Sequence, residues 1–299
     1  MLPLTGYHVL DLTDARGAFC VSLLANMGAE VSRVDITTSE GCKQLRRLAA
    51  AADVLVEDSP PGQLESLGFG YNNLAAKNPG LIMASITDFG QEGPYRDLKS
   101  CDLVAGALGG WLSVTGLPEA PLKPYGEQAY RMASLYAANG ILLALWRRHE
   151  TGRGQRIDIS IMECVAATLD HVLVRYFYEG VVSGRRGGRH WNDAFAIFPC
   201  RDGHVLLSVF REWETLVEWL ASEGMAGDLA GPKWRDAGAR QAGIDHIIGV
   251  LARWASTHTA EELVEKGQLM RFPWAKVVTI PELLASPQLA ARGFFRGEF

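Results

Sequence analysis

The stretch 7-YHVLDLTDARGAFCVSLLANMGAEVSRVD-35 decides the expected fold, because it reads as strand, helix and strand in succession. Residues 7–13 form a short apolar run, residues 18–28 have helical spacing and end at a glycine, and residues 30–35 again have a strand-like pattern. This order is typical of a βαβ unit with parallel strands. The chain therefore opens as an α/β fold.

The alternation continues up to residue 87. A helix is expected over 39–52 with Ser39 as its N-cap, followed by a strand over 53–58, a helix over 63–68 and a strand over 81–87. Strands that alternate with helices in this way favour a doubly wound parallel sheet of the Rossmann-like kind. From about residue 130 to 180 the chain is expected to be mostly helical.

The loop 183-SGRRGGRHWND-193 is the strongest break in composition, and we place a domain boundary there. Beyond it, residues 194–200 and 203–209 flank a turn and predict a hairpin, and residues 211–224 and 243–257 predict amphipathic helices. The predicted domains are a large α/β domain over 1–188 and a smaller α+β domain over 189–299.

Composition excludes several classes of function. The 299 residues are 48% hydrophobic and 21% charged, the formal net charge is −5, and no long run of Lys or Arg occurs, so a nucleic-acid partner is not expected. Neither a secretory signal nor a membrane-spanning stretch is evident, and we expect a cytoplasmic location. The five cysteines and seven histidines show no metal-ligand or disulfide spacing, so no metal site is expected.

Four segments carry a resemblance to one family. They are 53-DVLVEDSPPGQLESLGFGYNNLAAKNPGLIMASITDFGQEGPYRD-97, 98-LKSCDLVAGALGGWLSVTG-116, 126-GEQAYRMASLYAANGILLALWRRHETGRGQRIDIS-160 and 272-FPWAKVVTIPELLASPQLAARGFF-295. The chain resembles the family III CoA-transferases, which include formyl-CoA and carnitine CoA-transferases and have α-methylacyl-CoA racemase as a relative. The first segment follows the family pattern DVLVENFRPGxxxxLGLGYexLxxxNPxLIxxSITGFGxxGPYrD.

The resemblance implies an acyl-CoA and a small carboxylic acid as substrates, no permanently bound cofactor, and a dimer. The turn before residue 18 would expose backbone N–H groups to an anion, although one glycine in such a turn is more often steric. Asp58 and Ser59 stand where the family has Asn and Phe, near the adenosine end of CoA. The residues implied in CoA binding are Arg16, Gly17, Ala18, Asp58, Ser59 and Lys99.

Tyr130 stands where the family carries its catalytic aspartate. In family transferases that carboxylate attacks the acyl-CoA carbonyl, and the mixed anhydride is then converted to an aspartyl-CoA thioester. The ordinary pKa of a Tyr hydroxyl is about 10, against about 3.9 for Asp, so the hydroxyl is far less readily ionised at neutral pH. The alternative interpretation of Tyr130 is an aromatic side chain that fills the space of an active site.

Two carboxylates are candidates for the missing chemistry. Asp102 falls where the family has an acidic residue near the thioester, although a helix N-cap explains it equally well. Glu127 lies three residues from Tyr130 and would share its face of a helix. In the racemase relatives a His precedes the acidic position, and here that residue is Cys101, so a racemase would lack one proton carrier.

Two departures accompany these substitutions. The chain runs directly from Val34 to Asp35, where the family has several tens of further residues that contribute to the CoA site, and it ends shortly after 291-ARGFF-295, where family members continue. The loop 185-RRGGRH-190 lies where some transferases have a glycine-rich flap. Its arginines and His190 are candidates for phosphate contacts, with a solvated linker as the alternative.

Two classes of function follow. The first is a subunit of a CoA-transferase that lacks its own nucleophile and pairs with an active homologous subunit, in a homodimer or heterodimer. The second is an active acyl-CoA:carboxylate CoA-transferase with altered chemistry. A racemase-like enzyme or an inactive relic is the remaining alternative.

Overall fold

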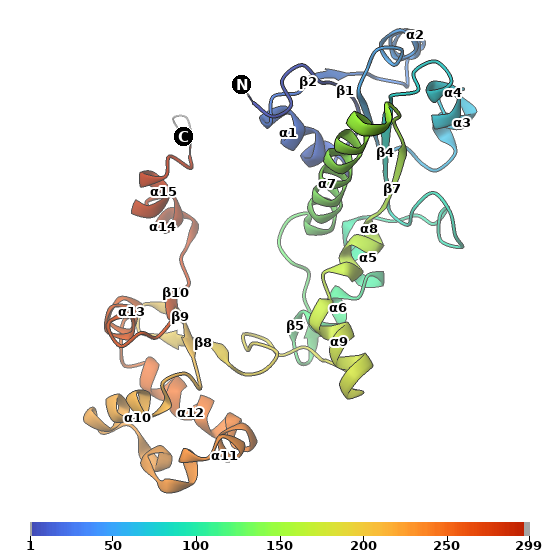
Figure 1. Ribbon diagram of the computed structural model, residues 1–299. Helices are drawn as coiled ribbons and strands as arrows, with labels where there is room; N and C mark the ends of the chain where they lie inside the picture. Colours follow the sequence, from blue (N-terminus) through green and yellow to red (C-terminus); the bar gives the residue numbers. More distant parts are fainter. Residues whose placement is uncertain (1, 296–299) are drawn as a thin grey trace. The chain divides into compact units, whose positions relative to one another are not determined.

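A computed structural model describes residues 2–295 of the chain (Figure 1). The chain divides into two compact units between Arg185 and Arg186. Each unit has its own hydrophobic core, and each is considered by itself.

The first unit is built on a five-stranded sheet whose paired strands are all parallel, in the order β2-β1-β3-β4-β7. The strands are β1 (His8–Leu12), β2 (Glu30–Arg33), β3 (Val54–Glu57), β4 (Ile82–Thr87) and β7 (Arg156–Ser160). Strands β3 and β4 are buried along their whole length, as expected of strands that helices cover on both faces.

Helices pack on both faces of this sheet (Figure 1). Along β1, Val9 belongs to the core under α1 (Ala18–Asn26) and α7 (Gln128–Thr151), whereas its neighbour Leu10 belongs to the core under α2 (Ser39–Leu48). Successive side chains of a strand point to opposite faces, so an apolar strand can serve two cores. The predicted doubly wound parallel sheet is confirmed.

Short elements complete the first unit. They are α3 (Gln63–Ser66), α4 (Tyr71–Ala75), α5 (Asp102–Leu108), α6 (Trp111–Val114), β5 (Gly116–Leu117), β6 (Ala120–Pro121), α8 (Ile161–Ala167) and α9 (Asp170–Glu179). The expected N-cap at Ser39 is wrong by one residue. Thr38 has the extended backbone of an N-cap and its Oγ1 accepts from the Gly41 N–H at 3.0 Å, so Ser39 is already helical.

The second unit contains a three-stranded antiparallel sheet in the order β10-β9-β8, formed by β8 (Phe195–Cys200), β9 (Gly203–Ser208) and β10 (Ala275–Lys276). The predicted hairpin is β8 and β9. The helices are α10 (Trp213–Ser222), α11 (Ala237–Ala242), α12 (Ile244–Ala255), α13 (Ala260–Leu269), α14 (Ile280–Leu284) and α15 (Pro287–Ala291), with 3₁₀ turns η1 (Gly227–Ala230) and η2 (Pro232–Arg235). Helix α10 begins later than expected because Glu212 has a left-handed φ of 47°.

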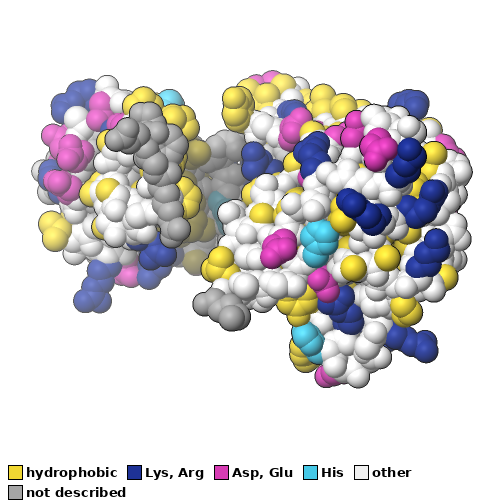
Figure 2. Space-filling view, turned by 90° about the horizontal axis from the view of Figure 1, so that it is seen from above, with side chains coloured by type: hydrophobic (Ala, Val, Ile, Leu, Met, Phe, Trp, Pro, Cys, Tyr) yellow, Lys and Arg dark blue, Asp and Glu magenta, His cyan; other side chains and the backbone are white. Residues whose placement is uncertain are grey.

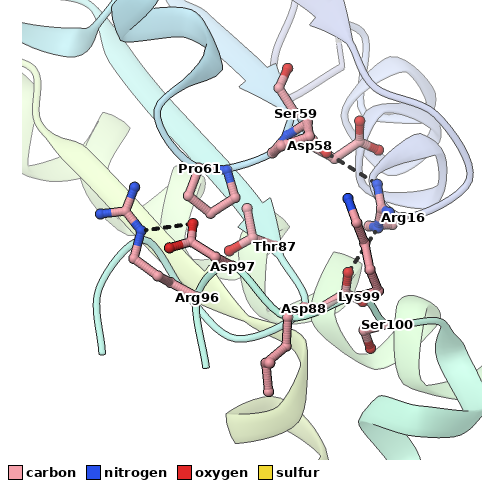
Figure 3. A pocket seen from close by; sticks show the side chains of 12 residues that line it. Arg16, Asp58, Ser59, Pro61, Thr87, Asp88, Arg96, Asp97, Lys99 and Ser100 are labelled. Atoms are coloured by element: carbon pink, nitrogen blue, oxygen red, sulfur yellow. Dashed lines mark hydrogen bonds and ion pairs between the residues drawn. The ribbon is translucent and has the colours of Figure 1, made fainter. Parts of the chain in front are cut away.

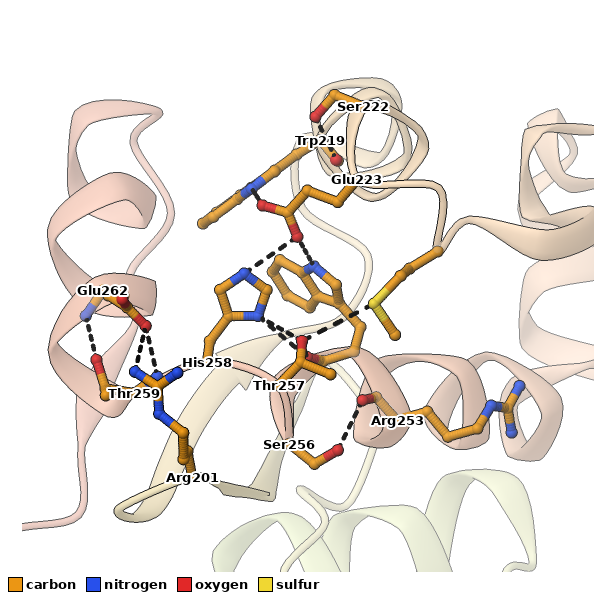
Figure 4. Close-up of polar contacts among 12 residues, drawn as sticks. Arg201, Trp219, Ser222, Glu223, Arg253, Ser256, Thr257, His258, Thr259 and Glu262 are labelled. Atoms are coloured by element: carbon orange, nitrogen blue, oxygen red, sulfur yellow. Dashed lines mark hydrogen bonds and ion pairs between the residues drawn. The ribbon is translucent and has the colours of Figure 1, made fainter.

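A carboxylate organises the aromatic core of the second unit (Figure 4). Glu223 accepts from the indole N–H groups of Trp219 and Trp254 at 2.8 and 2.7 Å, and its Oε2 lies 3.1 Å from His258 Nε2. Burial alone would raise the pKa of Glu223, but the two indole donors and His258 outweigh burial and lower it. Both oxygens of the Glu223 carboxylate therefore have partners within the second unit, and the group stabilises the fold.

Two features of the surface bear on partners. On the face seen in Figure 2, basic side chains are interspersed with acidic and hydrophobic ones rather than gathered in one patch. No helix within residues 2–295 is long and apolar enough to cross a membrane.

Candidate functional site

A pocket of about 330 Å³ lies at the carboxyl edge of the parallel sheet. It is formed by the segments that follow β1, β3 and β4 and by residues 96–100 (Figure 3). After β1 the chain first adds β2 on one side and then crosses to β3 on the other, so the strand order reverses between β1 and β3. Crevices at such a reversal are the usual ligand sites of open α/β sheets.

Arg16 is the central cation of this pocket (Figure 3). Its Nη1 donates to the Asp58 carbonyl oxygen at 3.2 Å, and its Nε lies 3.4 Å from Asp88 Oδ2. Its own carbonyl oxygen accepts from the Ser134 hydroxyl of α7 at 2.9 Å, which ties the loop after β1 to that helix. Burial opposes the charge of Arg16, but Asp88 and then Asp14 outweigh it and raise its pKa above the ordinary value.

The turn before α1 is occupied by a carboxylate of the chain itself. Asp58 Oδ2 accepts from the backbone N–H of Asp14 at 2.7 Å and of Gly17 at 3.2 Å. Burial, followed by the neighbouring Asp14, raises the pKa of Asp58 to about 7. Burial would also raise the pKa of Asp14, but its hydrogen bond to Asp58 and the adjacent Arg16 lower it instead. The anion position that the sequence places at this turn is thus filled internally.

The glycine of the turn has a steric role. A Cβ on Gly17 would lie 2.4 Å from Thr13 Cγ2, which is closer than two carbon atoms approach. Ala18 is the first residue of α1 and is exposed. Neither residue lines the pocket, whereas Arg16, Asp58, Ser59 and Lys99 do. The structure therefore brings together four of the six residues that the resemblance implies in CoA binding.

A second pocket of about 440 Å³ adjoins the first and shares Arg16, Asp58, Ser59 and Pro60 with it. Its other wall is the connection from β2 to α2, where the family pattern has additional residues. This short connection closes on itself, since Asp35 Oδ1 accepts from the backbone N–H and hydroxyl of Thr37 at 2.9 and 2.6 Å. The connection is thus a locally hydrogen-bonded turn.

Asp102 caps a helix, but not the one expected. The N-cap of α5 is Cys101, and Asp102 is the first helical residue. Its Oδ1 accepts from the backbone N–H groups of Ala129 and Tyr130 at 2.9 and 3.2 Å, and its Oδ2 lies 3.2 Å from Lys123 Nζ. The carboxylate therefore satisfies the otherwise unpaired first turn of α7. It does not line either pocket.

Glu127 is not brought into the site either. It is the exposed residue that precedes α7, and its side chain does not line the pocket beside Arg16. The two carboxylates proposed from the sequence thus lie at the start of the same helix, one as a structural cap and the other in solvent.

Tyr130 lies in the first turn of α7 with only 8% of its surface exposed. Burial, and next the carboxylate of Asp88, raise the pKa of Tyr130 to about 12, while Arg16 acts in the opposite direction. At pH 7 a hydroxyl with this pKa is ionised in roughly one molecule in 10⁵. Tyr130 is therefore a neutral aromatic side chain in the first turn of α7.

Asp88 is the pocket residue that the sequence reasoning missed. It follows β4 directly, and burial raises its pKa while Arg16 and Ser100 act in the opposite direction. The signal was present in 85-SITDFG-90, where the family pattern reads SITGFG. A carboxylate in place of a glycine at the end of a buried strand is the feature that could have identified it.

The basic loop has structural partners. Arg186 and Arg189 both bind the buried carboxylate of Asp193, at 2.6 and 2.8 Å, and Arg189 also binds Asp245. Arg185 donates to the carbonyl oxygens of residues 117 and 118. These guanidinium groups already form ion pairs and hydrogen bonds within the protein, which does not favour their use as a phosphate site.

The sequence profile of CoA-transferase family III matches residues 32–297, which is most of the chain. The chain belongs to CoA-transferase family III. It is 33% identical to the BbsE subunit of a succinyl-CoA:(R)-benzylsuccinate CoA-transferase from Thauera aromatica, over 93% of this chain and 70% of that one. It is 29% identical to the beta subunit of a succinyl-CoA–L-malate CoA-transferase from Chloroflexus aurantiacus, over 97% and 82%.

The solved structures agree with this assignment. A CAIB/BAIF family protein from Brucella suis has a TM-score of 0.88 and 25% identity, covering 98% of this chain and 88% of that one. As a family III CoA-transferase chain, the protein has the family's fold.

Proposed function

We propose that this chain takes part in CoA transfer between acyl-CoA thioesters and carboxylic acids as a subunit without a nucleophile at position 130, paired with a homologous subunit that carries the aspartate. The observation that carries the proposal is Tyr130, which is buried and has a pKa of about 12. Nucleophilic catalysis on a thioester requires an ionised group, and this hydroxyl stays protonated at neutral pH.

Pairing is supported by the relatives and by the surface of the first unit. Two of the relatives are themselves subunits by name. Helices α7 and α9 expose large apolar side chains, namely Leu143, Trp146, Leu173, Val174, Tyr176, Phe177 and Tyr178. Exposed apolar residues that lie close together, as on the single helix α9, are typical of protein–protein contact surfaces. We propose a dimer, with a homologous chain as the partner.

The pocket fits the anionic ligand that this function requires. Arg16, Arg96 and Lys99 line it as candidate partners of phosphate groups, and Ser59 supplies a hydroxyl. Both guanidinium groups are already paired with an aspartate, which leaves Lys99 as the cation of the lining without an ion pair in the part of the chain that the structure describes. Asp58 opposes an anion at the turn before α1, because it already occupies the N–H groups there. CoA is thus proposed as a substrate that binds at the mouth of this pocket and not as a permanently bound cofactor.

A second candidate is an active transferase with altered chemistry. The specific observation in its favour is Asp88, a carboxylate that lines the same pocket and faces Arg16. The two candidates differ in whether the chain itself reacts with the thioester.

Calorimetric titration with CoA and succinyl-CoA tests the proposed function, with the chain alone and together with a homologous subunit that carries the aspartate. CoA binding by the chain alone, with transfer only in the pair, is the expected result. Tyr130→Phe is the matched control, and it should behave as wild type because the neutral hydroxyl has no part in the reaction. Failure to bind CoA in either setting would overturn the proposal.

A further inference from the structure

Asp88 is held rigidly at the edge of the pocket. It follows β4 directly, and its carbonyl oxygen accepts from the Met162 N–H of α8 at 3.0 Å. Its side chain is 14% exposed, and its Oδ2 lies 3.4 Å from Arg16 Nε. Main chain and side chain are thus both fixed, which is the requirement for a group that must meet a bound ligand in one geometry.

The other oxygen of the same carboxylate is unsatisfied. Asp88 Oδ1 is buried and accepts no hydrogen bond of standard geometry within the described residues 2–295, although the Ser100 side chain lies near enough to lower the pKa of the carboxyl group. Thr87 also lines the pocket, is 4% exposed, and its Oγ1 has no partner in that same part of the chain. Buried polar atoms without partners are uncommon and destabilise the folded state, so two adjacent ones in a pocket indicate a bound ligand.

Asp88 and Tyr130 belong to one electrostatic group around Arg16. Asp88 is the charge that raises the pKa of Tyr130 most, and both residues act on the pKa of Arg16. The family pattern has glycine at position 88 and aspartate at position 130, and this chain has aspartate and tyrosine.

We infer that Asp88 is a reacting carboxylate of this chain and attacks the carbonyl carbon of an acyl-CoA thioester bound in the pocket lined by Arg16 and Lys99. The inference rests on the proposed function in taking an acyl-CoA as the ligand. It develops the second candidate, in which the chain itself reacts, so a covalent adduct on the unpaired chain would replace the expectation that transfer occurs only in the pair.

The reaction balances without any further reactant. An Asp88 oxygen forms a bond to the acyl carbon, the carbon–sulfur bond breaks, and CoA leaves as thiolate with the electron pair. The thiolate then attacks Asp88 Cγ and releases the acyl group as a carboxylate, which leaves an aspartyl-CoA thioester. The acceptor carboxylate reverses both steps, so that its own acyl-CoA forms and Asp88 returns as an anion.

The neighbours of Asp88 have defined parts in this reaction. Arg16 is a positioning residue, because its ion pair orients the carboxylate and opposes the rise in the pKa of Asp88 that burial causes. The unpaired Thr87 hydroxyl is a donor within the same pocket for an oxygen of the bound thioester.

The test uses the purified chain with succinyl-CoA and no partner. Hydroxylamine converts an aspartyl-CoA thioester to a hydroxamate, and borohydride reduces it to an alcohol. Peptide mass spectrometry should find the hydroxamate or the alcohol on the peptide that contains Asp88. Asp88→Asn should abolish the adduct while CoA binding by calorimetry stays within about threefold of wild type, a change of less than 1 kcal/mol. Asp88→Gly, which installs the family's residue, should do the same if Asn disturbs folding.

The matched control is Glu92→Gln, which removes an exposed carboxylate from the same loop and should retain the adduct. CoA binding without an adduct in wild type, or an adduct that survives in Asp88→Asn, overturns the inference and leaves the proposed function intact. Absence of CoA binding to the wild-type chain overturns both.

Discussion

Asp102 Oδ1 accepts a hydrogen bond from the backbone N–H of Tyr130, with a nitrogen–oxygen distance of 3.2 Å. The family resemblance places Asp102 near the thioester, but in the structure Asp102 caps the first turn of α7. The same resemblance places the nucleophile in that turn, at position 130. The same oxygen also accepts from the Ala129 N–H at 2.9 Å. With both contacts and Lys123 in place, this carboxylate is a structural group.

Asp102→Ala should therefore lower the free energy of unfolding. The loss of a helix cap accounts for about 1–2 kcal/mol, and Lys123 loses its partner as well. Asp102→Asn keeps one acceptor oxygen and should lose less. Urea unfolding followed by circular dichroism measures both variants, and equal stability of Asp102→Ala and wild type would contradict the capping role.

Restoring the family pattern should relocate the reaction. In the double variant Asp88→Gly, Tyr130→Asp, the covalent adduct with succinyl-CoA should move to the peptide that contains residue 130. The single variant Tyr130→Asp keeps Asp88 and should react more slowly than the double variant, on the order of 10²-fold. The reason is that the carboxylates at positions 88 and 130, both beside Arg16, cannot both ionise easily. Equal rates for the single and double variants would show that Asp88 exerts no such repulsion.

Stability should fall as the pH rises through the range in which Asp58 ionises. Its pKa is raised from 3.8 to about 7, so between these values the folded state binds more protons than the unfolded state. The stabilisation is fully present below about pH 4 and is lost as the pH passes 7. Asp58→Asn should flatten this part of the profile, and urea unfolding from pH 5 to 8 compares the two chains.

A pH profile that is the same in Asp58→Asn and wild type would contradict the shifted pKa. Other groups with shifted pKa values, such as Glu57, contribute to both chains alike, so only the difference between the two profiles bears on Asp58.

The glycines of 151-TGRGQ-155 should differ sharply in their tolerance of alanine. A Cβ on Gly154 would lie 1.9 Å from the Leu81 carbonyl oxygen, so Gly154→Ala must displace the backbone at the start of β4. Gly152 ends α7 with φ 68° and has open space around it. Its replacement should reduce stability by only about 1 kcal/mol, whereas Gly154→Ala should reduce it by at least about 3 kcal/mol.

Thermal unfolding of the two glycine variants, compared with wild type, checks this order. A larger loss of stability in Gly154→Ala would show that Gly154 is required by its packing against the backbone at Leu81, directly before β4. A Gly154→Ala chain as stable as Gly152→Ala would show that the backbone there moves freely.

The parts of the site that a short stretch of sequence encodes could be predicted, and the contacts between distant stretches could not. The turn at Gly17 and the segment 85-SITDFG-90 were visible in the sequence, but the partner of each was not. That Asp58 fills the turn before α1 depends on the register of β3 beside β1, where Leu12 pairs with Glu57. Glu127 was proposed from its distance along the chain to Tyr130, and Asp102 from the family resemblance. Neither signal reports the direction of a side chain.

By itself, the sequence determined the family, the parallel sheet of the first unit and the hairpin of the second, because apolar periodicity and turn residues act over short stretches of chain. It also established that position 130 has no carboxylate. Only the tertiary structure decided that Asp102 caps α7, that Asp58 occupies the anion position and that Asp88 meets Arg16 in the pocket. These are contacts between residues 27 to 72 positions apart, and such contacts are fixed by the packing of strands and helices, which no local pattern encodes.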